Sequence, residues 1–246
     1  MNILLHVRAC QKDQCLPLQP GGMPFEKHFP WHALMAPEQW ALPPLPVGAT
    51  FCGACGTPLL KVTGRMWLPA PATRNGTASH ASHCLLLTAL TDLPEGPLET
   101  TVRKAGYSLA WVTLSDKGSR GMREDLSGPA IAGAVAAAMP LCHSQGFVLP
   151  DEVAPLRALL TELALSQCYD LICTTGGTGI APRDITPQVT ESLLDASLPG
   201  FSQAMLAASL AKTPHAIISR AAAGVLGQSI IINLPGSRKA GMENLA

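Results

Sequence analysis

The sequence has no excess charge of either sign and no long hydrophobic run. Its 246 residues include 17 basic and 17 acidic side chains, so bulk electrostatics gives no reason to expect a nucleic-acid partner. No apolar stretch approaches the roughly 20 residues of a membrane helix, so no membrane contact is expected. The N-terminus has too short an apolar run for the core of a signal peptide. We therefore expect a cytoplasmic protein.

The chain changes character near residue 100, which predicts two different domains. Residues 1–105 are rich in proline, glycine and cysteine, and prolines within 43–46 and 69–71 prevent long helices. Residues 93–100, with two prolines and a glycine, are typical of a linker or of the edge of one. Residues 106–246 instead alternate short apolar runs with helical patterns. We expect a small N-terminal domain of unidentified fold, followed by an α/β domain.

The pattern of residues 106–246 predicts a doubly wound α/β fold with a mostly parallel sheet. Ser127, followed by Gly128 and Pro129, is typical of a helix start, with Ser127 as the N-cap. The expected strands cover residues 109–114, 146–149, 169–174 and 229–234. The expected helices cover residues 127–139, 152–167, 186–196 and 201–211.

The most informative segment is residues 174–187, Thr-Thr-Gly-Gly-Thr-Gly-Ile-Ala-Pro-Arg-Asp-Ile-Thr-Pro, between an apolar strand and a helix start. Glycine lets backbone N–H groups approach a ligand closely, and successive N–H groups form a nest for phosphate. Asp184 is a candidate ligand for a divalent metal that bridges phosphate oxygens. The alternative is a solvated surface turn. The candidate phosphate-binding residues are Thr175, Gly176, Gly177, Thr178, Gly179 and Arg183.

Polar residues also follow the other predicted strands. Ser115 and Asp116 follow the first strand, and Asp151 follows the second. In a parallel sheet these acids and Asp184 share one rim, although each alone is typical of a helix cap or a solvated loop. Three at equivalent strand ends favour metal–nucleotide chemistry. The last strand is followed by a second candidate nest formed by Pro235, Gly236 and Ser237.

Taken together, these residues resemble the MogA/MoaB-type molybdopterin adenylyltransferase family. The resemblance covers about 140 residues, which is far more than chance similarity would produce. The matching segments are residues 114–121, 124–128, 150–152, 174–187, 198–201, 208–210, 212–214, 218–220 and 233–237.

The resemblance implies a three-layer fold, usually trimeric, that joins molybdopterin to ATP in a Mg²⁺-dependent reaction and releases pyrophosphate. It implies that Asp151 and Asp184 are catalytic and hold Mg²⁺, and that contact with a metal-insertion protein follows. Two departures stand out: Arg238 replaces a proline of the family loop, and the chain stops ten residues past Gly236, where relatives continue through a closing helix.

Residues 1–105 resemble no family, but their cysteines suggest a metal site. Cys10, Cys15, Cys52 and Cys55 form two pairs that are candidate zinc ligands, with His80, His83 and Cys84 as alternatives. The other interpretation is a set of unrelated reduced thiols. Without metal we expect this proline-rich part to bury little core of its own.

Three functions remain open. The first is an active adenylyltransferase, favoured by the intact Asp151 and Asp184 motifs. The second is a non-catalytic molybdopterin- or nucleotide-binding scaffold with a metal-binding N-terminal module. The third is a metal-sensing or thiol-carrying protein in which the α/β part mainly oligomerises.

Overall fold

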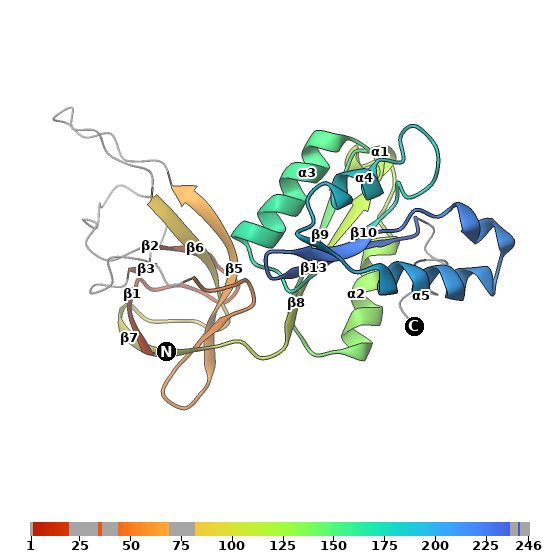
Figure 1. Ribbon diagram of the computed structural model, residues 1–246. Helices are drawn as coiled ribbons and strands as arrows, with labels where there is room; N and C mark the ends of the chain where they lie inside the picture. The colour runs from red at the N-terminus through yellow and green to blue at the C-terminus, as the bar shows by residue number, and fades with distance from the viewer. Residues whose placement is uncertain (1, 20–33, 36–43, 69–81, 237–240, 242–246) are drawn as a thin grey trace. The chain divides into compact units, whose positions relative to one another are not determined.

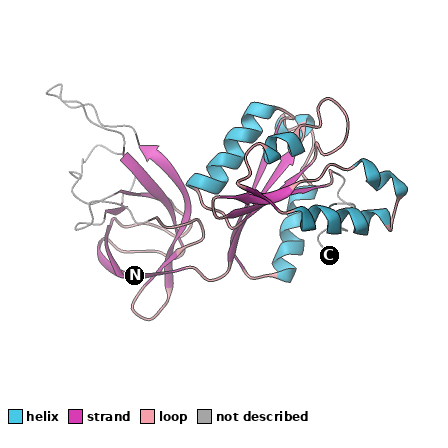
Figure 2. Cartoon of the chain, viewed as in Figure 1, coloured by secondary structure: helices cyan, strands magenta, loops and turns pink. Residues whose placement is uncertain are grey.

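The structure is a computed structural model that describes residues 2–19, 34–35, 44–68, 82–236 and 241. The chain divides into two compact units, Met1–Ala105 and Gly106–Ala246. In the described part of the first unit the regular elements are strands, whereas helices and strands alternate in the second unit (Figure 2). No helix within the described ranges is long and apolar enough to span a membrane.

The first unit is a closed β-barrel. Its strand order is β1-β3-β2-β6-β5-β4-β7, and β1 closes the ring by pairing antiparallel with β7. The strands are β1 (Asn2–Val7), β2 (Cys15–Gln19), β3 (Leu34–Met35), β4 (Thr50–Cys52), β5 (Pro58–Leu68), β6 (Ser82–Ala89) and β7 (Gly96–Arg103). The expectation of a linker over residues 93–100 is therefore wrong, because most of this segment is the barrel strand β7.

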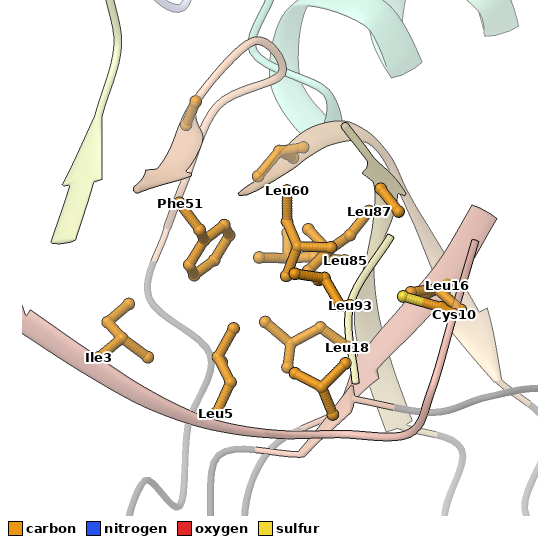
Figure 3. Packing of buried hydrophobic residues seen from close by; sticks show 14 residues of the cluster. Ile3, Leu5, Cys10, Leu16, Leu18, Phe51, Leu60, Leu85, Leu87 and Leu93 are labelled. Atoms are coloured by element: carbon orange, nitrogen blue, oxygen red, sulfur yellow. The ribbon is translucent and has the colours of Figure 1, made fainter. Parts of the chain in front are cut away.

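The barrel encloses a hydrophobic core. Along β1 every second side chain is buried, as period-two strand geometry requires, and Ile3 and Leu5 point inward. Figure 3 shows them facing Phe51, Leu60 and Leu85 from other strands. The expectation that this unit buries little core of its own is wrong. Its core is built from every second side chain of short strands, so it does not need long apolar runs in the sequence.

The second unit contains a six-stranded mixed sheet in the order β11-β12-β13-β10-β8-β9. Strands β9, β8, β10 and β13 run parallel, and β12 and β11 add an antiparallel edge. The strands are β8 (Tyr107–Leu114), β9 (Leu141–Leu149), β10 (Leu171–Thr175), β11 (Ala196–Ser197), β12 (Ala223–Leu226) and β13 (Ser229–Leu234).

Helices cover both faces of this sheet and give three layers (Figure 1). Ile131 of α2 and Met205 of α5 pack against Leu109, Cys173 and Ile232 on one face, and α3 and α4 lie on the other. The helices are α1 (Asp116–Ser119), α2 (Ser127–Ala138), α3 (Val153–Thr161), a π-helix η1 (Glu162–Ser166), α4 (Thr186–Glu191), α5 (Pro199–Leu210) and a 3₁₀ helix η2 (Pro214–Ile218).

Several element boundaries differ from the sequence prediction. The helix expected over residues 186–196 ends at Glu191, and Ala196–Ser197 instead forms β11. The helix expected over residues 152–167 passes into the π-helix η1. Ser127 is not the N-cap of α2: the Asp125 carboxylate accepts hydrogen bonds from the backbone N–H groups of Ser127 and Gly128, both at 3.0 Å.

Candidate active site

Strand register brings four loops to one edge of the sheet. Leu114 of β8 lies beside Leu149 of β9, and Thr175 of β10 lies between Thr113 of β8 and Leu234 of β13. Because these strands are parallel and end level, the loops that follow them meet at their carboxyl ends. Ligands of open α/β sheets bind at this position.

The glycine loop, residues 176–185, leaves the sheet by a tight turn in which a side chain at Gly176 would not fit. Gly176 has φ = 99°, and a Cβ there would lie 2.6 Å from the carbonyl oxygen of Leu114. The Thr186 hydroxyl donates to the Gly176 carbonyl at 2.8 Å and ties the start of the loop to α4. A residue other than glycine would push the loop away from β8.

The loop after β13 packs directly on the glycine loop. The buried Thr175 hydroxyl donates to the Pro235 carbonyl at 3.0 Å, and a Cβ on Gly236 would lie 3.1 Å from the Gly176 Cα. The two predicted nests are therefore adjacent, although Ser237 lies outside the described residues. Together they border a cavity of about 390 Å³, which is lined by Thr113, Leu114, Ser115, Gly118, Arg123, Glu124, Asp125, Leu126, Ser127, Val148, Thr175, Gly176 and Gly236.

The side chain of Asp116 is hydrogen-bonded to the backbone of Asp151. The Asp116 carboxylate accepts the backbone N–H of Asp151 at 3.2 Å and also pairs with the guanidinium of Arg183. This hydrogen bond, followed by Arg183, lowers the pKa of Asp116. Desolvation by burial raises the pKa of Asp151, and the Asp116 and Asp184 carboxylates raise it further. A cation bound at Asp151 would stabilise the ionised carboxylate and so oppose this rise in pKa.

Asp184 lies within the glycine loop with one carboxylate oxygen already engaged. Its Oδ2 accepts the backbone N–H of Ala181 at 2.8 Å. Within the described ranges, no three His, Cys, Asp or Glu side chains are placed to hold one metal ion. Asp151 and Asp184 are carboxylates, and Mg²⁺ in proteins uses one or two carboxylates together with water and substrate phosphates.

The remaining predicted residues have structural partners. Ser115 caps α1 by accepting the backbone N–H of Gly118 at 3.1 Å. Thr178 is buried, and its carbonyl accepts the backbone N–H of Arg220. Arg183, with a side chain 66% exposed, lies at the surface beside Asp116.

Two residues near this edge were not among the predicted site residues. Asp125 joins β8 to α2, because it accepts the Thr113 hydroxyl at 2.9 Å as well as the two helix N–H groups. An Asp two residues before a helix start is a capping signal that sequence reasoning could have used. Arg220 donates to carbonyls of the glycine loop. Contacts with backbone carbonyls leave no sequence pattern.

Among the described residues of the barrel, no three of the predicted zinc ligands come together. Cys10 and Cys52 are buried and Cys15 and Cys55 are exposed, and no three of these four thiols come together. Cys10 instead forms a backbone bridge with Leu93. These thiols do not fit a zinc site, and His80 lies outside the described residues.

Comparison with known proteins assigns the second unit to a family. Residues 110–246 match the family described as a probable molybdopterin binding domain. The chain therefore belongs to this family.

Named relatives agree with this assignment. The chain is 42% identical over 136 residues to a molybdopterin adenylyltransferase of Helicobacter pylori, covering 54% of this chain and 77% of that protein. It is 40% identical over 156 residues to gephyrin of Dictyostelium discoideum, covering 60% of this chain but only 22% of gephyrin.

Solved structures show the same fold. A MoaB structure from Thermus thermophilus, titled as a molybdopterin biosynthesis enzyme, is 42% identical with a TM-score of 0.51, over 56% of this chain and 87% of that one. A MogA structure is 36% identical with a TM-score of 0.53, over 56% and 89%.

Proposed function

We propose that this protein adenylylates molybdopterin in molybdenum cofactor biosynthesis. An oxygen of the terminal phosphate of molybdopterin attacks the α-phosphorus of ATP. The new O–P bond forms as the bond to the β-phosphate oxygen breaks, and pyrophosphate leaves with that electron pair. The products are adenylyl-molybdopterin and pyrophosphate.

One observation supports this proposal most strongly: the glycine loop, the Pro235–Gly236 loop and two strand-end acids meet at one edge of the sheet. Phosphate transfer of this kind depends on positioning and charge neutralisation more than on a protein nucleophile. The meeting of two backbone nests with Asp151 and Asp184 supplies both requirements. The adenylyltransferase names of relatives that match 37–42% of residues point the same way.

Each residue has a role in this scheme. Backbone N–H groups of residues 176–179 orient the nucleotide phosphates, and Arg183 leaves Asp116 to pair with a phosphate. Asp151 and Asp184 would hold Mg²⁺, which when bound neutralises charge on the reacting phosphates. The 390 Å³ cavity beside Gly176 and Gly236 receives the pterin end of molybdopterin.

A homotrimer is part of the proposal. Large apolar side chains are exposed on α5 and η2, and a subunit contact would cover them. These residues are Phe201, Leu210, Ile217 and Ile218. Transfer of the adenylylated product to a metal-insertion protein would follow, because adenylylation activates the pterin for that step.

The test is incubation of the full chain with molybdopterin, ATP and Mg²⁺, with chromatographic detection of the adenylylated pterin. Asp184→Asn should lower turnover at least about tenfold, or about 1.4 kcal/mol of barrier, with little change in fold. Glu191→Gln is the matched control, because this exposed acid lies at the far end of α4. Wild-type turnover in Asp184→Asn removes this residue from the mechanism. Binding of both substrates without product favours the non-catalytic scaffold.

A further inference from the structure

The hydrogen bonds within the glycine loop lie near its tip and at its base. At its tip Ile180 is 72% exposed. Near the tip, the Asp184 N–H donates to the Ala181 carbonyl at 2.9 Å and the Ala181 N–H donates to Oδ2 of Asp184 at 2.8 Å. At the base, the Thr186 N–H donates to the Gly177 carbonyl at 3.1 Å and its hydroxyl to the Gly176 carbonyl at 2.8 Å. Such short turns with exposed tips open easily unless another part of the chain holds them.

Arg220, in the segment between η2 and β12, contacts both arms of this loop. The first arm, residues 176–179, leaves the sheet. There the Nε of Arg220 donates to the Gly179 carbonyl at 2.8 Å, and its backbone N–H donates to the Thr178 carbonyl at 3.2 Å. On the returning arm, its terminal NH2 donates to the Asp184 carbonyl at 2.6 Å. One half-buried side chain therefore joins two arms that are otherwise linked at the tip and the base.

The space between the arms is closely filled. A Cβ on Gly179 would lie 2.7 Å from Oδ2 of Asp184, so the Asp184 carboxylate packs against the backbone of the opposite arm. If the arms separated, Asp184 would lose this contact and its position relative to Asp151. The guanidinium of Arg220 spans the two carbonyls on either side of this contact.

We infer that Arg220 is a positioning residue that clamps residues 178–184 and thereby fixes Asp184 for catalysis. The inference rests on the proposed function for its catalytic consequence, although the clamp itself is a property of the fold. Arg220 donates to the neutral carbonyl oxygens of Gly179 and Asp184. Arginine suits this role because its planar fork presents several N–H groups at fixed angles, whereas lysine presents one ammonium nitrogen.

The clamp is tested by hydrogen exchange in the full chain without ligands. In Arg220→Met, the hydrogen-bonded amides of Ala181, Asp184 and Ile185 should exchange at least about tenfold faster, a loss of about 1.4 kcal/mol of local protection, while the barrel strands exchange as in wild type. Arg220→Lys should give an intermediate rate. Arg157→Met is the matched control, because Arg157 is exposed and donates to Ser192 at 3.4 Å, away from the loop. Unchanged loop exchange in Arg220→Met overturns the inference.

The catalytic consequence is tested separately by steady-state kinetics. Arg220→Met should lower kcat and raise the Mg²⁺ concentration needed for half-maximal activity, with little change in KM for molybdopterin. Millimolar guanidinium should restore part of the activity of Arg220→Ala. It would not restore activity to a variant whose whole fold had been destabilised. A lower kcat with no change in Mg²⁺ dependence and no rescue overturns the positioning role. Absence of activity in the wild type refutes the proposed function, while faster loop exchange in the variant would still support the clamp.

Discussion

The hydrogen bond from Thr175 to Pro235 offers a sharp test of how the two nests are held together. The Thr175 side chain is 2% exposed, and its hydroxyl lies 3.0 Å from the Pro235 carbonyl oxygen. Thr175→Val keeps the shape of the side chain but leaves the carbonyl without this donor. The expected loss is about 1–3 kcal/mol of unfolding free energy. For a unit of this size that corresponds to a fall in Tm of roughly 4–12 °C.

The effect on activity follows from the packing of Gly236 on Gly176. Without the hydrogen bond, the Pro235–Gly236 loop is released from the glycine loop, so KM for molybdopterin should rise in Thr175→Val. Thr175→Ser keeps the hydroxyl and should retain the wild-type KM, although the lost methyl lowers its Tm. Calorimetry and initial-rate measurements on both variants check this. If Thr175→Val matches the wild type in Tm and KM, the bond does not hold the two loops together.

Three further predictions concern other parts of the chain. Asp151→Asn should abolish most activity and yet raise the Tm of the metal-free protein at neutral pH. Burial raises the pKa of Asp151 in the folded state, so ionisation of this carboxyl lowers the free energy of unfolding once the pH rises above its pKa in the unfolded state. A lower Tm in the variant would contradict this. Asp125→Ala should lower the Tm by several degrees, because the N–H groups at the start of α2 lose their acceptor; an unchanged Tm would refute the capping role. At pH 8 the exposed Cys55 should react rapidly with a thiol reagent and the buried Cys84, whose pKa burial raises to about 11, should react slowly; equal rates would refute the barrel core.

Sequence patterns predicted the second unit well where strands are short apolar runs. β13 matches its predicted range of residues 229–234, because consecutive isoleucines are typical of a strand buried on both faces. β12 was missed, since Ala223–Leu226 is four residues long and contains a glycine. The end of α4 was also missed, because nothing local marks the antiparallel pairing of Ala196–Ser197 with β12.

The barrel could not be predicted because its pairing is nonlocal and its strands contain turn-forming residues. β7 begins with Gly96 and Pro97, which resemble a linker, yet it pairs with β1 at the other end of the unit. The Gly64 region of β5 shifts register against β6. Local rules cannot supply either feature.

For the candidate site, the sequence indicated which loops meet but not how they are joined. The register of the parallel strands brings together the loops after β8, β9, β10 and β13, as a parallel sheet predicts. The hydrogen bond from Asp151 to Asp116 and the clamp by Arg220 depend on side chains that reach backbone atoms 35 to 41 residues away. Such contacts follow from packing, which a single sequence does not reveal.

Transfer of isotope from labelled ATP tests the central claim most directly. The full chain is incubated with molybdopterin, Mg²⁺ and ATP labelled at either the α- or the γ-phosphorus. Attack at the α-phosphorus predicts that α-label enters the pterin product and γ-label appears only in pyrophosphate, and that Asp184→Asn lowers both at least about tenfold. γ-Label in the pterin, or no label in the pterin from either position, would contradict adenylylation by this site.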